Sequence, residues 1–202
     1  MIGKDIIFRE VDPAKIKIDA RELSARLGGY CTACSGIADE YIADISECSS
    51  PRYAAVVCEV EYSDGEVIIA GAKIRSDALI KNLDGATRVV LMAVTLGVGV
   101  DTYIRRTSAS SGMRGYMADA VASALAEALC DLAEYELCRD CVSRPRFSPG
   151  YGDLPLGFQR TLLSRIGAES LLGITLTDSL LMVPTKSITA IIGIKNEKNI
   201  TN

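Results

Sequence analysis

The residues that decide the fold are Tyr53-Ala-Ala-Val-Val-Cys-Glu-Val-Glu-Tyr62, then Ser63-Asp64-Gly65, then Glu66-Val-Ile-Ile-Ala-Gly71. Both flanking runs are rich in β-branched and aromatic residues, which are favoured in strands. Asp-Gly between two such runs is a strong signal for a tight hairpin turn. The stretch therefore predicts two antiparallel strands, 53–62 and 66–71, and with them an antiparallel sheet.

Hydrophobic periodicity on either side of this hairpin predicts further elements. We expect strands at Asp5–Glu10, Arg88–Thr95, Leu180–Val183 and Ser187–Ile194, and helices at Asp19–Leu27, Ser35–Cys48, Asp77–Leu83, Gly115–Leu137 and Phe158–Ile166. The apolar run 88–95 is typical of a buried central strand. No repeat or flexible linker divides the chain, so residues 1–202 are expected to form a single domain. Its fold class is α+β, with a mainly antiparallel twisted sheet and packed helices.

Composition excludes several classes of function. The 202 residues are 49% hydrophobic and 24% charged, as in an ordinary globular protein, and the 22 basic residues are scattered within a net charge of −4. Because no basic cluster could follow a row of phosphates, nucleic acid is not an expected partner. No run approaches the roughly 20 apolar residues of a membrane span, and the first residues do not begin a secretory signal. We therefore expect a cytoplasmic protein with no membrane partner.

The chain contains no histidine. Its absence removes the commonest general base, the commonest metal ligand and every Ser-His or Cys-His arrangement. Chemistry must then use carboxylates, thiols, hydroxyls, lysine or arginine, or belong to a bound cofactor or a partner. We assign no catalytic residue.

The segment Cys138–Gly157 is the longest irregular stretch, with three prolines and three glycines, and such loops are usually functional. At its centre stands Arg146-Phe147-Ser148-Pro149-Gly150-Tyr151. Arginine offers a planar fork of donors to a carboxylate, and Pro-Gly lets backbone groups approach a flat ligand. Tyrosine adds an aromatic face and a hydroxyl. These features suit an amino-acid nucleoside, although the same residues also occur in ordinary turns.

Two motifs in the C-terminal half carry a family resemblance. The run from Arg146 to Pro155 resembles the Arg-x-x-x-Gly-Tyr-x-x-x-Pro signature of the reactivation (activation) domain of cobalamin-dependent methionine synthase. The run from Gly173 to Ser179 resembles that family's Gly-x-x-Leu-Thr-Glu-Ser segment, with Asp178 in place of the glutamate. The helical residues 125–128 fit as well. The resemblance implies an activation domain-like fold.

The resemblance also implies a site for S-adenosylmethionine. Arg146 would pair with the ligand carboxylate, Ser148 and Gly150 would present backbone, and Tyr151 would line the adenosine side. Glu127 would face the cationic end. A physical reason supports Glu127, because the ligand has two positive groups and an arginine alone would leave one of them uncompensated.

The function that the resemblance implies is that of an accessory component of a cobalamin-dependent methionine synthase, a methyltransferase of methionine biosynthesis. The chain would support reductive methylation, or reactivation, of cobalamin. Its partners would be a separate corrinoid protein, which presents the cobalamin, and a flavodoxin-like reductant. Methyl donor and cobalt would do the chemistry, and the chain would supply orientation and electrostatics.

Two alternatives remain open. Cys31-x-x-Cys34 and Cys138-x-x-Cys141 could supply four thiolates to a metal or act as redox pairs, although 103 residues separate them. The chain could also be a corrinoid-protein scaffold that kept the fold and lost the ligand.

Gly97-x-Gly99 follows the predicted strand 88–95 and is similar to part of a nucleotide-binding glycine loop. The third glycine and the ribose-binding acid of that motif are missing. We therefore predict no nucleotide site there.

Overall fold

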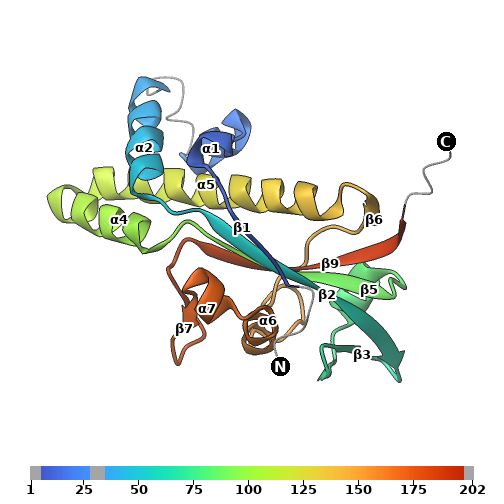
Figure 1. Ribbon diagram of the computed structural model, residues 1–202. Coiled ribbons are helices and arrows are strands. Elements are labelled where there is room, and N and C mark those ends of the chain that lie inside the picture. The colour runs from blue at the N-terminus through green and yellow to red at the C-terminus, as the bar shows by residue number, and fades with distance from the viewer. Residues whose placement is uncertain (1–5, 28–34, 198–202) are drawn as a thin grey trace, which may run out of the picture.

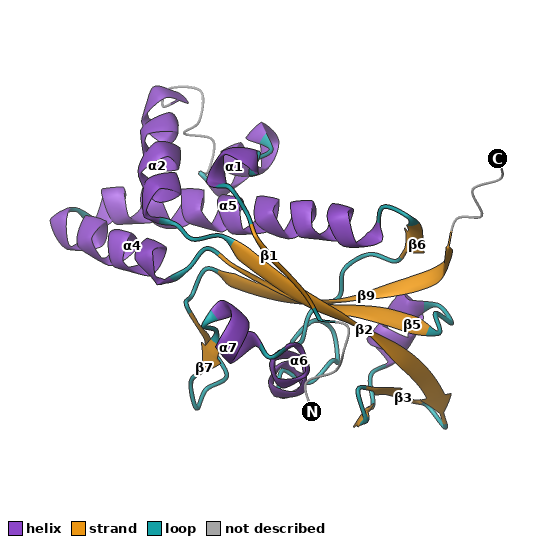
Figure 2. Ribbon diagram, in the orientation of Figure 1, coloured by secondary structure: helices purple, strands orange, loops and turns teal. Residues whose placement is uncertain are grey.

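The computed structural model describes residues 6–27 and 35–197, and its centre is an antiparallel sheet (Figure 2). The strands are β1 (Ile7–Glu10), β2 (Arg52–Ser63), β3 (Glu66–Ile69), β4 (Ala72–Ile74), β5 (Arg88–Thr95), β6 (Cys141–Ser143) and β9 (Ser187–Glu197). They lie in the order β4-β3-β2-β5-β9-β6, and β1 also pairs with β2. The hairpin signal at 63–65 is confirmed, because Ser63 pairs with Glu66 across the Asp-Gly turn.

Helices cover both faces of this sheet (Figure 1). On one face lie α1 (Ala20–Arg26), α2 (Ser35–Cys48), α4 (Val98–Ser110) and α5 (Gly112–Cys138), and on the other lie α3 (Asp77–Leu83), α6 (Phe158–Ile166) and α7 (Ala168–Leu172). A short 3-10 turn spans Pro13–Lys15, and β7 (Thr175–Leu176) pairs with β8 (Met182–Val183) apart from the main sheet. The α+β class with a mainly antiparallel sheet and packed helices is confirmed.

Strand β5 explains why both faces need a helical layer. It pairs with β2 on one side and β9 on the other, and seven of its eight residues are buried. Val90, Met92 and Val94 face the α5 layer, whereas Val89 and Leu91 face the α6 layer. A strand that is apolar on both faces can be shielded from water only by a layer on each side. The prediction of a buried central strand at 88–95 is therefore confirmed.

Helix α5 is the longest element, and its 27 residues correspond to about 40 Å at 1.5 Å per residue. It packs against α4, α2, α1, β5 and β9 (Figure 1). Seven alanines are among its buried residues, and such small side chains let neighbouring elements approach closely. Its acidic residues beyond Ala126 remain at least partly exposed near the C-terminal half, beside the sheet edge formed by β6 and β9.

Several sequence predictions need correction. Helices α4 and α7 and strands β4, β6 and β7 were not predicted, and the expected strand 180–183 is reduced to Met182–Val183 because Leu180 has a left-handed backbone with φ of 66°. The irregular segment 138–157 contains β6, and Phe147 forms an isolated bridge with Ile191 of β9. The sequence also predicts that Gly28-Gly29 ends the helix 19–27, and these two glycines lie outside the described residues. None of the described helices has the length and apolar character needed to span a membrane.

Gly99 has a packing role that explains the glycine pair after β5. A Cβ atom on Gly99 would lie 2.0 Å from the backbone carbonyl oxygen of Cys48, the last residue of α2. One on Gly97 would lie 2.2 Å from the Ser50 hydroxyl oxygen. The glycines therefore allow α4 to begin against the end of α2.

We predict that Gly99→Ala lowers the free energy of unfolding by about 1–3 kcal/mol, because the new methyl group overlaps a backbone atom that cannot move alone. Urea denaturation followed by circular dichroism measures the change. Gly112→Ala is the matched control, since a Cβ there meets nothing within 4 Å. This substitution should leave stability unchanged or raise it slightly. Equal effects of the two substitutions would contradict the close-packing explanation.

Candidate functional site

A cavity of about 380 Å³ lies between α5 and the chain that follows β6. Its lining residues are Glu127, Glu134, Pro145, Arg146, Ser148, Tyr151 and Ile188. Its size falls within the range of small-molecule sites, about 300–1,000 Å³. The structure thus brings four of the five predicted site residues, Glu127, Arg146, Ser148 and Tyr151, to one cavity. Gly150 lies in the same loop but is not among the lining residues.

The loop 146–153 is fastened at two points. At its start, the Phe147 N–H donates to the Ile191 carbonyl oxygen at 2.9 Å, and the Ile191 N–H donates back at 2.8 Å. At its end, the Asp153 carboxylate accepts hydrogen bonds from the Ser76 hydroxyl and from the backbone N–H groups of Asp77 and Ala78. Asp153 therefore caps the N-terminus of α3 from a distance in sequence.

Hydrogen bonds inside the loop determine which backbone groups a ligand could use. Gly150 has φ of 92°, a left-handed value that favours glycine, and its N–H donates to the Leu154 carbonyl oxygen at 3.0 Å. The Ser148 carbonyl oxygen accepts from the Tyr151 N–H at 3.0 Å. A carbonyl oxygen has a second lone pair, so Ser148 can still accept, whereas the Gly150 N–H is already used. That Ser148 and Gly150 present backbone to a ligand stays a prediction.

Tyr151 is exposed over 58% of its surface, although its ring is held in place on one side. Its ring packs edge-on against Phe147, with centroids 6.1 Å apart and planes inclined at 74°. Edge-to-face packing of this kind is a favoured aromatic geometry. The free part of the ring is therefore available as a surface for a flat ligand at the rim of the cavity.

Arg146 is surrounded by acidic side chains of α5. Its Nη1 lies 2.6 Å from Asp131 and 3.1 Å from Glu134, and its Nη2 lies 3.6 Å from Glu127. The other carboxylate oxygen of Glu127 lies 3.7 Å from Arg26 of α1. The Arg146 side chain is only 25% exposed, so these ion pairs are partly desolvated. The sequence analysis does not predict a role for Asp131 or Glu134. Asp131 follows Glu127 by four residues and Glu134 follows Asp131 by three, and this spacing places all three acids on one helix face.

Burial raises the pKa of the Glu134 carboxyl group above its ordinary value; Arg146 opposes this rise and Asp131 adds to it. Burial also raises the pKa of the nearby Cys130 thiol to about 12. Cys130 is therefore protonated at neutral pH and is not a nucleophile in the ordinary sense. The charged groups at the cavity are an arginine and carboxylates, which can bind and orient a ligand that carries charges of both signs.

The thiolate alternative gains no support from the described residues. Cys138 and Cys141 are free and line one hollow, and burial, together with nearby Glu134 and Cys141, raises the pKa of the Cys138 thiol to about 12. Among residues 6–27 and 35–197, no group of three or more potential ligands could hold a metal ion. Cys31 and Cys34 lie outside the described residues, so the four-thiolate arrangement stays a prediction.

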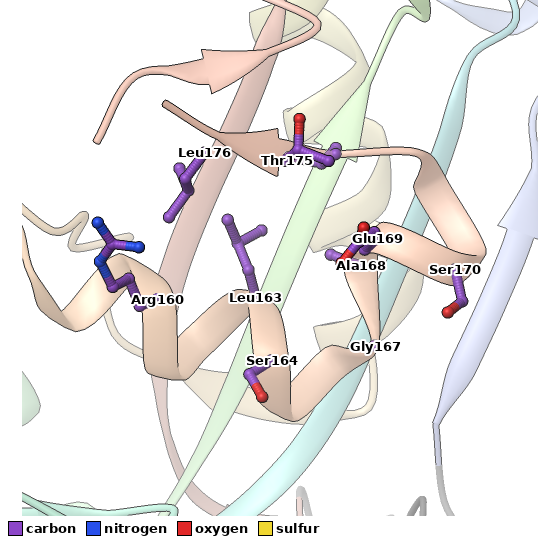
Figure 3. Close-up of a pocket in the computed structure, with 10 residues that line it drawn as sticks. Arg160, Leu163, Ser164, Gly167, Ala168, Glu169, Ser170, Thr175 and Leu176 are labelled. Atoms are coloured by element: carbon purple, nitrogen blue, oxygen red, sulfur yellow. The ribbon is translucent and has the colours of Figure 1, made fainter. Parts of the chain in front are cut away.

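A larger hollow of about 510 Å³ lies on the other side of the sheet, around α6, α7 and β7. Figure 3 shows the residues around it, which include Arg160, Leu163, Ser164, Glu169, Ser170, Thr175 and Leu176. Its charged residues Arg160 and Glu169 are exposed. None of the predicted site residues lies there. The smaller cavity is the better candidate because it combines a partly buried ion-pair network with backbone groups and an aromatic ring.

The fold and this cavity define a three-layer α+β domain with a charged, small-molecule-sized site at one edge of its sheet. A solved structure of this kind is the crystal structure of the MetH reactivation domain bound to AdoHcy. The two align with a TM-score of 0.74 over 94% of this chain and 78% of the other, at 15% sequence identity. The chain therefore has the fold of the MetH reactivation domain, as its sequence predicts. No protein-family model and no curated protein matches the sequence.

The Asp153 anchor generates a pH-dependent prediction. Hydrogen bonding from Ser76 lowers the pKa of this carboxyl group below its ordinary value, and the amides of α3 contribute, although slight burial opposes them. A carboxyl group with a lowered folded-state pKa stabilises the fold above its unfolded-state pKa of about 3.9, and the effect is lost as pH falls through the folded-state value. We predict that Asp153→Asn is less stable than wild type at pH 7 and that the difference shrinks below about pH 4.

Urea denaturation at several pH values measures this difference, and hydrogen exchange of the Asp77 and Ala78 amides reports the loop anchor directly. Both amides should exchange faster in the variant. Asp64→Asn, at an exposed hairpin position with φ of 45°, is the control and should resemble wild type. A stability difference that stays constant from pH 7 to pH 2 would refute the role of the Asp153 charge.

Proposed function

We propose that this chain binds S-adenosylmethionine in the cavity beside α5 and presents its methyl group to cobalamin held by a separate corrinoid protein. The observation that carries the proposal is the presence of Arg146, Glu127 and Tyr151 at one cavity of ligand size. The MetH reactivation domain, whose fold this chain shares, was crystallised bound to AdoHcy, and this supports the same ligand class.

The side chains fit the charges of the ligand. S-adenosylmethionine carries a carboxylate and an ammonium group on the α-carbon of its amino-acid portion, and a sulfonium at the other end of that portion. Arg146 suits the carboxylate, because guanidinium stays charged and offers paired donors. Glu127 suits the ammonium group, and it must then exchange its present partners, 3.6 Å and 3.7 Å away, for the ligand. Those contacts are long for charge-assisted hydrogen bonds, so the exchange costs little.

The adenosine portion suits the rim of the cavity. Tyr151 offers an exposed ring there, and the Ser148 carbonyl keeps one lone pair for a donor on the base or ribose. An exposed rim leaves one side of the ligand open to another molecule. This openness favours delivery to a partner over a reaction completed within the chain.

Bound S-adenosylmethionine supplies an activated methyl group, and cobalamin on the partner is its acceptor once a flavodoxin-like reductant has provided an electron. The chain's own residues bind and orient the methyl donor. That division of labour agrees with the absence of histidine. We place the protein in the cytoplasm, which the free thiols of Cys48, Cys58, Cys130, Cys138 and Cys141 support.

Isothermal titration with S-adenosylmethionine tests the proposal. Wild type should bind, and Arg146→Ala should weaken binding by about tenfold or more, because a charge-assisted pair contributes about 1.5–3 kcal/mol. Arg160→Ala is the matched control, since it removes an arginine from the larger hollow and should leave the affinity unchanged. Absence of binding at millimolar ligand, or equal affinity in wild type and Arg146→Ala, would refute the site.

The proposed partner requires its own experiment. A tagged copy of the chain, purified from the cells that make it, should retain a corrinoid protein that is recognised by the visible absorbance of cobalamin. Arg146→Ala should retain it equally, because Arg146 is assigned to the methyl donor. Purification that repeatedly yields the chain without any cobalamin absorbance would count against the corrinoid partner.

A further inference from the structure

The larger hollow, around α6, α7 and β7, has no part in the proposed function. It lies on the face of the sheet opposite α5, and its volume is about 510 Å³. In Figure 3 Arg160 stands at one end and Glu169 toward the other, with Leu163 between them. The hollow therefore offers a positive charge, an apolar floor and a negative charge one after another.

The two charges in the larger hollow are available to a ligand. The side chains of Arg160 and Glu169 are both exposed. Within residues 6–27 and 35–197, neither side chain takes part in an ion pair or a hydrogen bond. A ligand with a negative group at one end and a positive group at the other is therefore attracted at both ends of the hollow.

The backbone of β7 adds hydrogen-bonding groups to the same hollow. In the β7–β8 pair, Leu176 lies opposite Met182. The next residue, Thr177, donates its N–H to the Leu181 carbonyl oxygen at 2.9 Å, which is toward β8. Successive residues of a strand point their N–H and C=O groups to opposite edges. The N–H and C=O of Leu176 therefore point away from β8.

The edge of β7 that carries these two groups faces α7. The N–H of Ile174, two residues before Leu176, points to the same edge and donates to the Ala168 carbonyl oxygen of α7 at 3.3 Å. In the part of the chain that the structure describes, Leu176 makes no backbone hydrogen bond at this edge. A strand edge with a free N–H and C=O is a template for another extended chain.

These features together fit an extended peptide segment. An antiparallel strand added to β7 exchanges both hydrogen bonds with Leu176 through a single residue. The side chain of that residue lies on the same face as the Leu176 side chain, which packs against the core cluster that contains Leu163 and Ile174. An apolar side chain is therefore favoured at the position opposite Leu176.

The charges determine the residues on either side of this position. Side chains two residues apart in a strand share a face and lie about 6.5–7 Å apart along the chain, so they reach toward the two ends of the hollow. Figure 3 shows β7 running from the Glu169 side toward the Arg160 side, so an antiparallel segment has its acidic residue first. A free amino acid does not suit both ends, because its carboxylate and ammonium group share one carbon atom.

We propose that the larger hollow docks an extended segment of a partner protein, which pairs with the free edge of β7. The segment carries an acidic, an apolar and a basic residue at alternating positions. Its acidic residue pairs with Arg160, its apolar residue lies opposite Leu176, and its basic residue pairs with Glu169. The docking site is separate from the cavity beside α5 and does not depend on the proposed function.

Nuclear magnetic resonance titration with the peptide acetyl-Asp-Ser-Val-Ser-Lys-amide tests the site. The Leu176 N–H resonance should move, and its hydrogen exchange should slow, because the peptide backbone accepts its hydrogen bond. Arg160→Ala and Glu169→Gln should each weaken binding by about two- to fivefold, as for an exposed ion pair. Lys81→Ala removes an exposed charge from α3 in the same helical layer and should leave the affinity unchanged.

Modified peptides test the backbone pairing without any change to the protein. N-methylation of the central valine removes the donor to the Leu176 carbonyl oxygen and should weaken binding by about two- to tenfold. N-methylation of the serine that follows is the matched control, because its N–H points away from β7. The peptide with its two charged residues exchanged should also bind more weakly than the original.

Three results would overturn the inference: an unmoved Leu176 N–H resonance at millimolar peptide, equal affinities of the two N-methylated peptides, or binding of free valine as tight as that of the peptide. The last result would indicate a small-molecule site. Isothermal titration with S-adenosylmethionine in the presence of the peptide should give an unchanged affinity. A protein that binds the peptide but not S-adenosylmethionine would refute the proposed function alone.

Discussion

The burial of β5 on both faces is the constraint on which the rest of the structure depends. Its alternating side chains supply apolar surface to two separate cores, so helices must cover the sheet from both sides. Helix α5 supplies most of one layer, and α3, α6 and α7 form the other. The candidate cavity follows from this arrangement, because the chain after α5 must pass from one layer to the other around the β9 edge of the sheet. Along this path the chain places Arg146 beside the acidic side chains of α5.

The sequence predicted helices and strands correctly where the local hydrophobic pattern matched the burial of the residues in the folded chain. Helices 35–48, 77–83 and 158–166 and strand 88–95 have the predicted bounds, since each combines a clear period with a clear start or stop. Helix α4 was not predicted, because Gly97 and Gly99 indicated a loop. In the structure the two glycines, which have no side chain, allow the start of α4 to pack closely against Ser50 and Cys48. Close packing of this kind depends on a neighbour that is distant in sequence, which periodicity does not report.

The residues around the candidate cavity were anticipated from the sequence only in part, for a similar reason. Arg146 and Tyr151 belong to a contiguous motif, and Glu127 was found through a family resemblance and a charge argument. The helical spacing could have grouped Asp131 and Glu134 with Glu127 on one face of α5. Only the structure shows that the loop brings Arg146 into contact with them. The role of Asp153 could not be foreseen, because its partners Ser76, Asp77 and Ala78 are more than 70 residues away in the chain.

The groups that anchor the loop 146–153 differ from the side chains that this loop presents to the candidate cavity. Backbone hydrogen bonds to Ile191 fix one end and the Asp153 carboxylate fixes the other, while the side chains of Ser148 and Tyr151 take part in neither. Natural variation at these two positions can therefore change which ligand the cavity accepts without detaching the loop from the sheet and from α3. The fold has in this respect a modular architecture, in which recognition can diverge among descendants while the framework stays constant.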